Sequence, residues 1–467
     1  ACSFNLGEEI IPQRILDALT AGHIRTIYVI GQGTAAVAGS AIAEALSVYL
    51  KGTRINIQAK KASDLSGFVS DEELKAALVI AVTQSGTTTD TNRAVTMARE
   101  KGAHIIAIVN RRQSDITTKA HGVFYTSDGR DIEMSVASTK AFYAQIVAGF
   151  VIALFMAKEL GVMPDGIIVK EIASLETIPQ QMIKVIERRD DIRAAAWDIV
   201  RRKRYWAVVG SGANKVAADE VRIKLSELCY KTISSDIIED KKHIDLSAEP
   251  LILVMAAGSP EIVLEDIVKD TAIFKAHAAK VVVIADEGEK RFRSVADYVI
   301  PVPRAAFPTS LIMNVLAGHI WGYYAACSLD EQAGLFRDFR VRLADTLSTH
   351  EAKGFSPYES IASKDLRAIV DPFAAEFHAW RSSSALATMN VDTASDLTLL
   401  LKYAVGKLPV EDFREDFKDK RVSSSPLEML DITLGKAIEE LSRPVDAIRH
   451  QAKTVTVGTS RKERELK

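Results

Sequence analysis

Short apolar runs alternate with longer segments of helical spacing along the first 330 residues. The run at 78–82 leads into a polar turn, a segment with helical spacing and a second apolar run at 105–109. Earlier in the chain, an apolar run at 26–30 precedes a segment of small residues at 35–50 whose spacing predicts a helix. Strands that alternate with helices in this way predict a mostly parallel sheet with helices on both faces.

The same pattern then occurs a second time. Residues 205–225 mirror 27–46, residues 250–288 mirror 76–110, and the run 298–302 mirrors 123–127. An amphipathic lead-in helix is expected at 8–21, a short strand at 55–58, and a charged helical connector at 162–202 between the two copies. We therefore expect an α/β protein with two tandem, doubly wound sheets.

The remainder of the chain lacks this alternation. Residues 330–441 are charged and carry helical periodicity, most clearly at 395–404 and 427–441, which predicts a helical insertion. The tail ends in a basic run. The expected parts are 1–22 (lead-in helix), 23–161 (first α/β domain), 162–202 (connector), 203–329 (second α/β domain), 330–441 (insertion) and 442–467 (tail).

Composition and charge exclude several classes of protein. The chain of 467 residues is 48% hydrophobic and 26% charged, and its net charge of −2 argues against a nucleic-acid or membrane-surface partner. Three cysteines without zinc-site spacing favour a reducing cytosol, and no metal or cofactor is expected. The most apolar stretch, 141–157, is short for a membrane span and predicts a buried core helix.

The turn between the first two apolar runs is rich in hydrogen-bond donors. It carries Thr83, Gln84, Ser85, Thr87, Thr88 and Thr89. A helix that starts here adds free backbone N–H groups and a positive end, which attract an anion. The turn lacks the lysine of a nucleoside-triphosphate loop, so a small phosphorylated metabolite fits better. A helix cap alone needs one or two hydroxyls. The second copy, at 256–260, has lost most of them, so only the first copy is expected to bind phosphate.

Three other places could carry chemistry. Lys224 and Glu227 are three residues apart and share one face of an expected helix, although an arbitrary pair of this kind is most often a surface ion pair. His243 lies among charged residues, where a lone histidine is usually a solvated loop residue. Lys453 lies between a helical pattern and a β-prone run, and it has no meaning by itself.

Taken together, these places resemble the isomerase half of the glutamine–fructose-6-phosphate aminotransferase family, which has two sugar isomerase (SIS) domains. The turn at 83–89 and the string EMSVASTKAF at 133–142 are similar to its first SIS domain. The segment KLSELCY at 224–230 is similar to the family pattern Lys-Leu-Lys-Glu-Ile-Ser-Tyr, and QAKTVTV at 451–457 to its C-terminal end. The resemblance covers residues 8–328 and 443–458.

The resemblance implies roles for individual residues. A phosphorylated hexose would be held by Gly33, Thr34, Thr83, Gln84, Ser85, Thr88, Val136, Ser138 and the backbone of Ala452. Lys453 would form a Schiff base with C2 of open-chain fructose 6-phosphate, and Glu227 would move a proton between C1 and C2. His243 would open the sugar ring from the partner subunit of a homodimer with shared active sites, and Lys224 would assist. The product would be glucosamine 6-phosphate, made with ammonia.

Several departures from the family pattern leave alternatives open. Ala35 replaces a serine, Thr87 replaces a glutamate, and Ile244-Asp245 stand where the family has Gly-Pro. A glutaminase domain is not expected before residue 8, so this stretch of chain is not expected to draw ammonia from glutamine by itself, and a glutaminase domain or subunit is a candidate partner. A deaminase, a deglycase or an isomerase with the same steps is the alternative among enzymes. A non-catalytic sugar-phosphate sensor is the alternative outside them.

Overall fold

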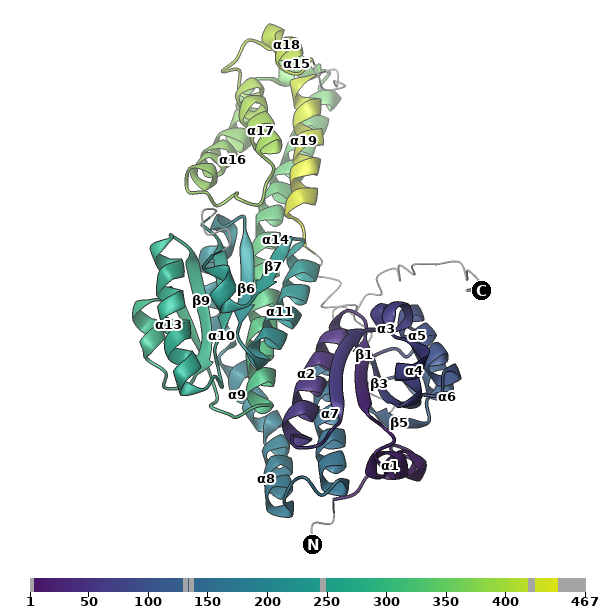
Figure 1. The fold of residues 1–467 in the computed structure, drawn as a ribbon. Helices are drawn as coiled ribbons and strands as arrows, with labels where there is room; N and C mark the ends of the chain where they lie inside the picture. Colours follow the sequence, from purple (N-terminus) through teal and green to yellow (C-terminus); the bar gives the residue numbers. More distant parts are fainter. Residues whose placement is uncertain (1–3, 129–132, 134–137, 244–248, 419–424, 444–467) are drawn as a thin grey trace.

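The computed structural model describes residues 4–128, 133, 138–243, 249–418 and 425–443. Two parallel five-stranded sheets lie next to each other, and an arm of helices extends away from the second (Figure 1). The expected α/β architecture with two tandem, doubly wound sheets is confirmed.

The first sheet has the strand order β2-β1-β3-β4-β5, and every pairing is parallel. Its strands are β1 (Thr26–Gly31), β2 (Asn56–Lys61), β3 (Ala77–Thr83), β4 (His104–Val109) and β5 (Gly122–Tyr125). The helices α1 (Gln13–Thr20), α2 (Thr34–Tyr49) and α7 (Lys140–Glu159) cover one face, and α3 (Ala62–Phe68), α4 (Asp71–Lys75), α5 (Thr89–Glu100) and α6 (Asp115–Lys119) cover the other. Apolar side chains of β3 point to both faces, so the strand is buried throughout.

The second sheet repeats this order as β7-β6-β8-β9-β10. Its strands are β6 (Trp206–Gly210), β7 (Ile233–Asp236), β8 (Leu251–Met255), β9 (Lys280–Asp286) and β10 (Tyr298–Val302). The helices α11 (Ala213–Cys229) and α14 (Thr309–Ala352) cover one face, and α12 (Ile238–Lys241), α13 (Glu261–Ala276) and the 3-10 turn η2 (Arg291–Ser294) lie on the other.

One hydrophobic core joins the two domains, because α2, α7, α11 and α14 all contribute to it between the sheets. Two glycines allow the helices to approach closely. A Cβ atom on Gly149 of α7 would lie 2.2 Å from the side chain of Ile42 in α2, and one on Gly318 of α14 would lie 2.4 Å from Val221 in α11. The repeated sequence therefore builds the same tight helix pair in each domain.

The connector between the domains is helical, as expected, and consists of α8 (Asp165–Glu176), α9 (Ile178–Glu187), α10 (Arg189–Ile199) and the 3-10 turn η1 (Val200–Arg202). Helix α7, which is long and apolar enough to span a membrane, has 78% of its most apolar window buried. It is the core helix that the sequence predicted.

The helical arm begins inside α14, which has 44 residues and is therefore about 66 Å long. It continues through α15 (Pro357–Ser360), α16 (Lys364–Ser382), α17 (Val391–Ala404), η3 (Val410–Asp412), α18 (Phe413–Asp416) and α19 (Pro426–Leu441). A separate core around Phe336, Phe339 and Phe373 holds these helices together. The backbone N–H of Arg443 donates to Asp330 Oδ1 at 3.0 Å, so the arm starts and ends at one place.

Three elements differ from the expectation. The lead-in helix begins at Gln13, after Pro12, which lacks the N–H that a helix interior requires. Strand β7 was not predicted, since it has four residues and only Ile233 is buried. The expected boundary between residues 329 and 330 falls inside α14, because the helix passes from one core to the next without a break.

Candidate functional site

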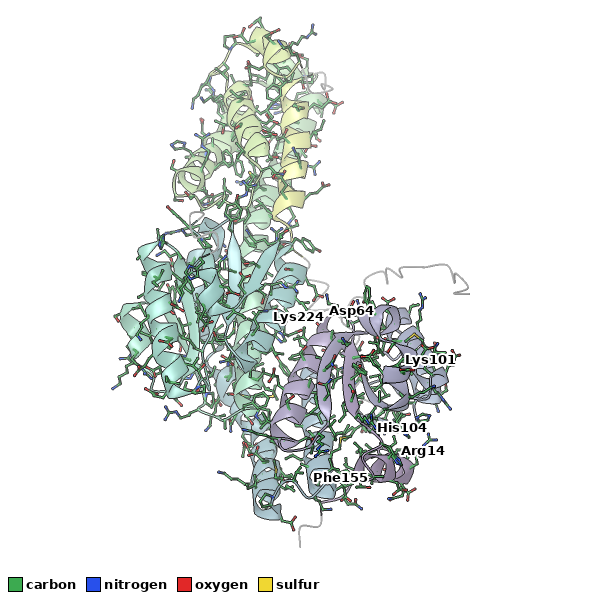
Figure 2. The ribbon with its side chains drawn as sticks, viewed as in Figure 1. Arg14, Asp64, Lys101, His104, Phe155 and Lys224 are labelled. Atoms are coloured by element: carbon green, nitrogen blue, oxygen red, sulfur yellow. The ribbon has the colours of Figure 1, made fainter. Side chains whose placement is uncertain are left out.

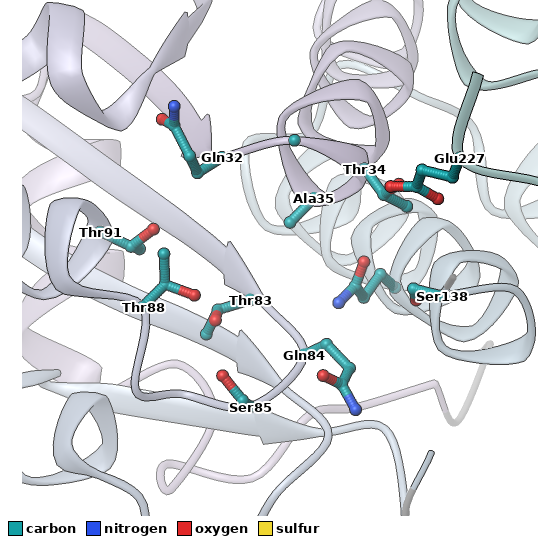
Figure 3. A pocket seen from close by; sticks show the side chains of 12 residues that line it. Gln32, Thr34, Ala35, Thr83, Gln84, Ser85, Thr88, Thr91, Ser138 and Glu227 are labelled. Atoms are coloured by element: carbon teal, nitrogen blue, oxygen red, sulfur yellow. The ribbon is translucent and has the colours of Figure 1, made fainter. Parts of the chain in front are cut away.

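A cavity of about 260 Å³ lies at the carboxyl ends of β1 and β3, where the strand order of the first sheet reverses (Figure 3). Open parallel sheets bind ligands at this point. Its lining comes from both domains: Gln32, Gly33, Thr34, Ala35, Thr83, Gln84, Ser85, Thr88, Thr91, Ser138, Gln145 and Glu227.

The hydroxyl-rich turn forms one wall of the cavity. Gly86 adopts φ +69°, and a Cβ atom there would lie 1.9 Å from Ser114 Oγ, so the turn requires glycine at this position. Thr83 Oγ1 accepts from the Gly86 N–H at 3.2 Å, and Asn92 Nδ2 donates to Gly86 O at 2.9 Å. These bonds fix the turn from behind, so that Ser85 and Thr88 face the cavity.

Helices α2 and α5 begin at the cavity, and α7 begins close to it, because Ser138 lines it two residues earlier. Backbone N–H groups at the start of α7 already have a hydrogen-bond acceptor, since the Glu133 carboxylate accepts from those of Thr139 (2.8 Å) and Lys140 (3.1 Å). Helix α5 differs, because Thr88 stands at its N-cap and its side chain makes no cap bond. The Thr88 hydroxyl therefore does not cap α5. The positive end of α5 can receive an anion.

Glu227 reaches the cavity from α11 in the second domain and lies beside Thr34 (Figure 3). Lys224 Nζ donates to Glu227 Oε2 at 2.7 Å, and Lys224 is 2% exposed at its side chain. The pair is therefore not the surface ion pair that this spacing usually forms. A carboxylate held in this way at the edge of a cavity can serve as a general base.

A buried polar cluster lies behind this pair. The Glu220 side chain is fully buried, and its Oε1 lies 3.7 Å from Lys224 Nζ and 3.5 Å from His319 Nε2. Thr34 Oγ1 donates to the same oxygen at 3.3 Å. On the far side, His319 Nδ1 and the Tyr143 hydroxyl are 2.6 Å apart, and burial, with Glu220 nearby, holds the pKa of Tyr143 well above its usual value. The cluster joins α2, α7, α11 and α14, so it couples the position of Glu227 to both domains.

The corresponding turn of the second sheet is occupied by the protein itself. The N–H of Gly258 donates to Asp286 Oδ1 at 3.1 Å, and the N–H of Ala257 lies 3.4 Å from Asn314 Oδ1. Burial raises the pKa of Asp286. A carboxylate and an amide thus take the donors that an external anion would need. That only the first turn binds an anion stays a prediction.

The structure brings many of the expected residues together. Gly33, Thr34, Thr83, Gln84, Ser85, Thr88, Ser138 and Glu227 all line the one cavity. Lys224 donates to Glu227 from the interior, and His243 is exposed beyond the end of α12 and is not among the residues that line the cavity. Val136, Ala452 and Lys453 lie outside the described residues.

The sequence analysis did not identify Gln32, Thr91 and Gln145 as lining residues. Gln145 is 1% exposed, and neither polar atom of its side chain has a partner among the described residues. The Thr91 hydroxyl and Gln32 Oε1 are unpartnered in the same sense. Buried polar groups without partners are uncommon, and next to a cavity they point to a ligand. A signal was available, because Gln145 is the one polar residue in the apolar run 141–157.

Within the described residues, no group of three or more His, Cys, Asp or Glu side chains is arranged to hold a metal ion. The site presents hydroxyls, amides, helix ends and one carboxylate paired with a buried lysine. That set suits an anionic, hydroxyl-bearing molecule and acid–base chemistry.

Comparison with known proteins assigns this α/β unit to a class. Residues 23–155 match the SIS domain family, so the chain carries a SIS domain there. Glutamine–fructose-6-phosphate aminotransferase of Streptomyces coelicolor is 30% identical over 316 residues, which cover 66% of this chain and 49% of that protein. The chain thus spans about half the length of the curated relatives it matches.

Solved structures show the same fold. The C-terminal domain of glucosamine-fructose-6-phosphate aminotransferase from Francisella tularensis superposes with a TM-score of 0.60 at 20% identity, covering 69% of this chain and 90% of that one. Tagatose-6-phosphate ketose/aldose isomerase from Escherichia coli gives a TM-score of 0.54 at 14% identity, with 68% and 88% covered. Both α/β domains of this chain therefore share the SIS-type architecture.

Proposed function

We propose that this chain binds fructose 6-phosphate and, with ammonia, converts it to glucosamine 6-phosphate. The observation that carries the proposal is the entry of Glu227, paired with buried Lys224, into the hydroxyl-lined cavity of the SIS domain. A sensor needs the anion-binding wall alone, whereas an aldose–ketose shift also needs a positioned carboxylate.

The phosphate would bind at the start of α5, among Ser85, Thr88 and the free backbone donors of that helix. No lysine or arginine lines the cavity within the described residues, so the contacts would be neutral hydrogen bonds and the helix field. Fixing the phosphate there would direct the rest of the sugar toward Glu227. Binding energy from the phosphate would thus orient C1 and C2.

The position of Arg443 supports a contribution from the tail. Its guanidinium lies 5.7 Å from the ring centroid of Tyr230, one helical turn beyond Glu227, and its backbone is bonded to Asp330. Lys453 follows ten residues later, and ten extended residues span about 33 Å. This length supports the proposal that Lys453 acts at the cavity, because Tyr230 and Glu227 lie together at the end of α11.

The proposed chemistry uses few groups. The Lys453 amine condenses with the C2 carbonyl of the open-chain sugar and releases water. Ammonia then displaces the lysine from C2. Glu227 takes a proton from C1 and returns it at C2, while the C1 hydroxyl loses its proton and the imine nitrogen gains one, which leaves an aldehyde at C1 and an amine at C2. His243, from a partner subunit, would open the sugar ring before these steps.

Borohydride trapping tests the proposal. The full chain is incubated with fructose 6-phosphate and reduced, and the modified residue is located by peptide mass spectrometry. A hexose phosphate adduct on Lys453, absent from Lys453→Arg, together with glucosamine 6-phosphate formed from added ammonium, is the expected result. Conversion of fructose 6-phosphate to an aldose phosphate in the absence of ammonium would indicate a simple isomerase. If the chain binds the sugar phosphate tightly but gives neither an adduct nor turnover, it is a non-catalytic sensor and the proposed function is wrong.

A further inference from the structure

A second, larger cleft lies on the other side of the turn at Gln32 and Gly33. It has a volume of about 700 Å³ and runs between α2 and the end of β2 in the first domain and α11 in the second. Figure 2 labels Asp64 and Lys224 on the two facing domains, and the cleft opens where these surfaces meet. Neither the hydroxyl-rich turn nor Glu227 lines it.

The cleft carries an excess of positive charge. Lys60, Lys61 and Arg222 line it, and within the described residues none of the three lies within 4.0 Å of a carboxylate oxygen. Lys60 Nζ sits 5.9 Å from the ring centroid of Tyr28. These cations come from two domains and line the same cleft, so they can contact one ligand together, unlike lysines scattered over a solvated surface.

The two acidic residues of the cleft offset this charge only in part. Asp219 is already engaged, because Lys215 Nζ lies 2.5 Å from its Oδ1 and the Ser235 hydroxyl donates to the same oxygen at 2.8 Å. Asp64 is exposed and interacts with the neighbouring Ser63 hydroxyl at 3.5 Å. An anionic ligand would therefore meet three cations that have no carboxylate oxygen within 4.0 Å among the described residues, and one exposed carboxylate.

The size and the apolar part of the lining define the ligand further. Val37 and Ile223 face the cleft from the two domains and are half-buried. A volume of this order accommodates a small molecule with an uncharged body. We propose that the cleft binds a small polyanion, a metabolite with two or more phosphate or carboxylate groups, and that its binding changes the affinity of the neighbouring cavity.

The coupling has a structural route. Gln32 and Gly33 line both hollows, and α11 presents Arg222 to the cleft and Glu227 to the cavity. A polyanion that draws α2 and α11 together would move Thr34 and Glu227 relative to each other. Binding and coupling are separate claims, and only the coupling rests on the proposed function. Thermodynamic linkage requires the same factor in both directions.

Calorimetry with inorganic pyrophosphate and with citrate tests binding on the full chain. The titrations use Ser85→Ala/Thr88→Ala, in which the first cavity is weakened, at constant ionic strength. Adding Lys61→Glu/Arg222→Glu to this variant should weaken the binding of each probe about tenfold or more. The control is Lys170→Glu/Arg189→Glu, which makes the same change of net charge on exposed helices and should change the affinity by no more than about twofold. Lys60→Glu/Lys61→Glu, confined to the edge strand, gives the same test if the first variant does not fold.

The outcomes separate the two proposals. If neither probe binds, or if both control and cleft variants weaken binding equally, the cleft is not a site. Pyrophosphate that changes fructose 6-phosphate affinity in the wild type but not in the cleft variant supports coupling. A change that persists in the cleft variant is competition at the first cavity and overturns coupling. A wild type that takes up no sugar phosphate refutes the proposed function, while pyrophosphate binding would still support the cleft.

Discussion

Glu227 Oε2 accepts a hydrogen bond at 2.7 Å from Nζ of Lys224, although the two residues share a helix whose usual pairs of this kind are solvated. Lys224 is buried, and its ammonium lies 3.7 Å from Oε1 of the fully buried Glu220. The pair holds the carboxylate at the edge of a cavity that belongs mainly to the other domain.

Replacing the carboxylate should remove turnover and spare binding. Glu227→Gln keeps the shape and a hydrogen-bonding oxygen but is not a base, so turnover with fructose 6-phosphate and ammonium should fall about a hundredfold or more. The dissociation constant for the sugar phosphate should change little. Steady-state assays and calorimetry check this, with the exposed Glu265→Gln as the matched control. Equal losses in both measurements would make Glu227 a binding residue.

Removing the buried ammonium should destabilise the fold. Lys224→Met leaves the fully buried Glu220 without its cation, and breaking a buried pair typically costs about 3–5 kcal/mol. Lys269→Met breaks an exposed pair with Asp266 and should cost less than about 1 kcal/mol. Urea unfolding of both variants gives the comparison. Similar small losses would mean that Lys224 and Glu220 do not stabilise the fold as a buried ion pair.

Gln145→Leu should have opposite effects on stability and binding. The buried amide has no partner among the described residues, so an apolar replacement removes a desolvated polar group and should preserve or raise the free energy of unfolding. If the amide contacts a sugar hydroxyl, affinity should fall about tenfold. Gln332→Leu is the control, because Gln332 Nε2 donates to Ala385 O at 2.7 Å in the arm. That variant should lose stability and keep its affinity.

Stability should fall as the pH drops below about 6.5, the ordinary histidine pKa. Burial, with a contribution from Arg14, lowers the pKa of His121 to about 4, and its Nδ1 accepts from the Ile105 N–H at 3.0 Å. The neutral ring is thus favoured in the folded state, and its contribution is lost as pH falls from about 6.5 toward 4. His121→Asn keeps an acceptor and should flatten this part of the curve. His277→Asn, at an exposed position, should not.

Two inactive variants should complement each other if active sites are shared. In a dimer that takes His243 from one subunit and Lys453 from the other, mixing His243→Ala with Lys453→Ala creates one intact site in each mixed dimer. After unfolding and refolding together, random pairing should restore about a quarter of wild-type turnover. The separately refolded variants are the control. No recovery, despite confirmed mixing, would place both residues in one subunit.

The arrangement of strands followed from the order of elements along the chain. Runs such as 78–82 and 105–109 are apolar on both faces because their sheet is covered on both faces, and this makes parallel strands visible in sequence. Strand β7 was missed because an edge strand of four residues with one buried side chain carries no such signal. The end of the second domain could not be predicted from sequence either, because the helical spacing of α14 continues unbroken from one hydrophobic core into the next.

The sequence by itself determined the two-fold repeat, the hydroxyl-rich turn and the carboxylate at position 227, because local periodicity and side-chain chemistry are properties of short segments. Only the tertiary structure decided that Glu227 faces the cavity of the other domain, that Lys224 is buried, and that Gln145 lines the site with no partner among the residues that the structure describes. It also showed that Asp286 and Asn314 fill the second turn. These features depend on contacts between segments far apart in the chain, and they arise when α2, α7, α11 and α14 pack into one core.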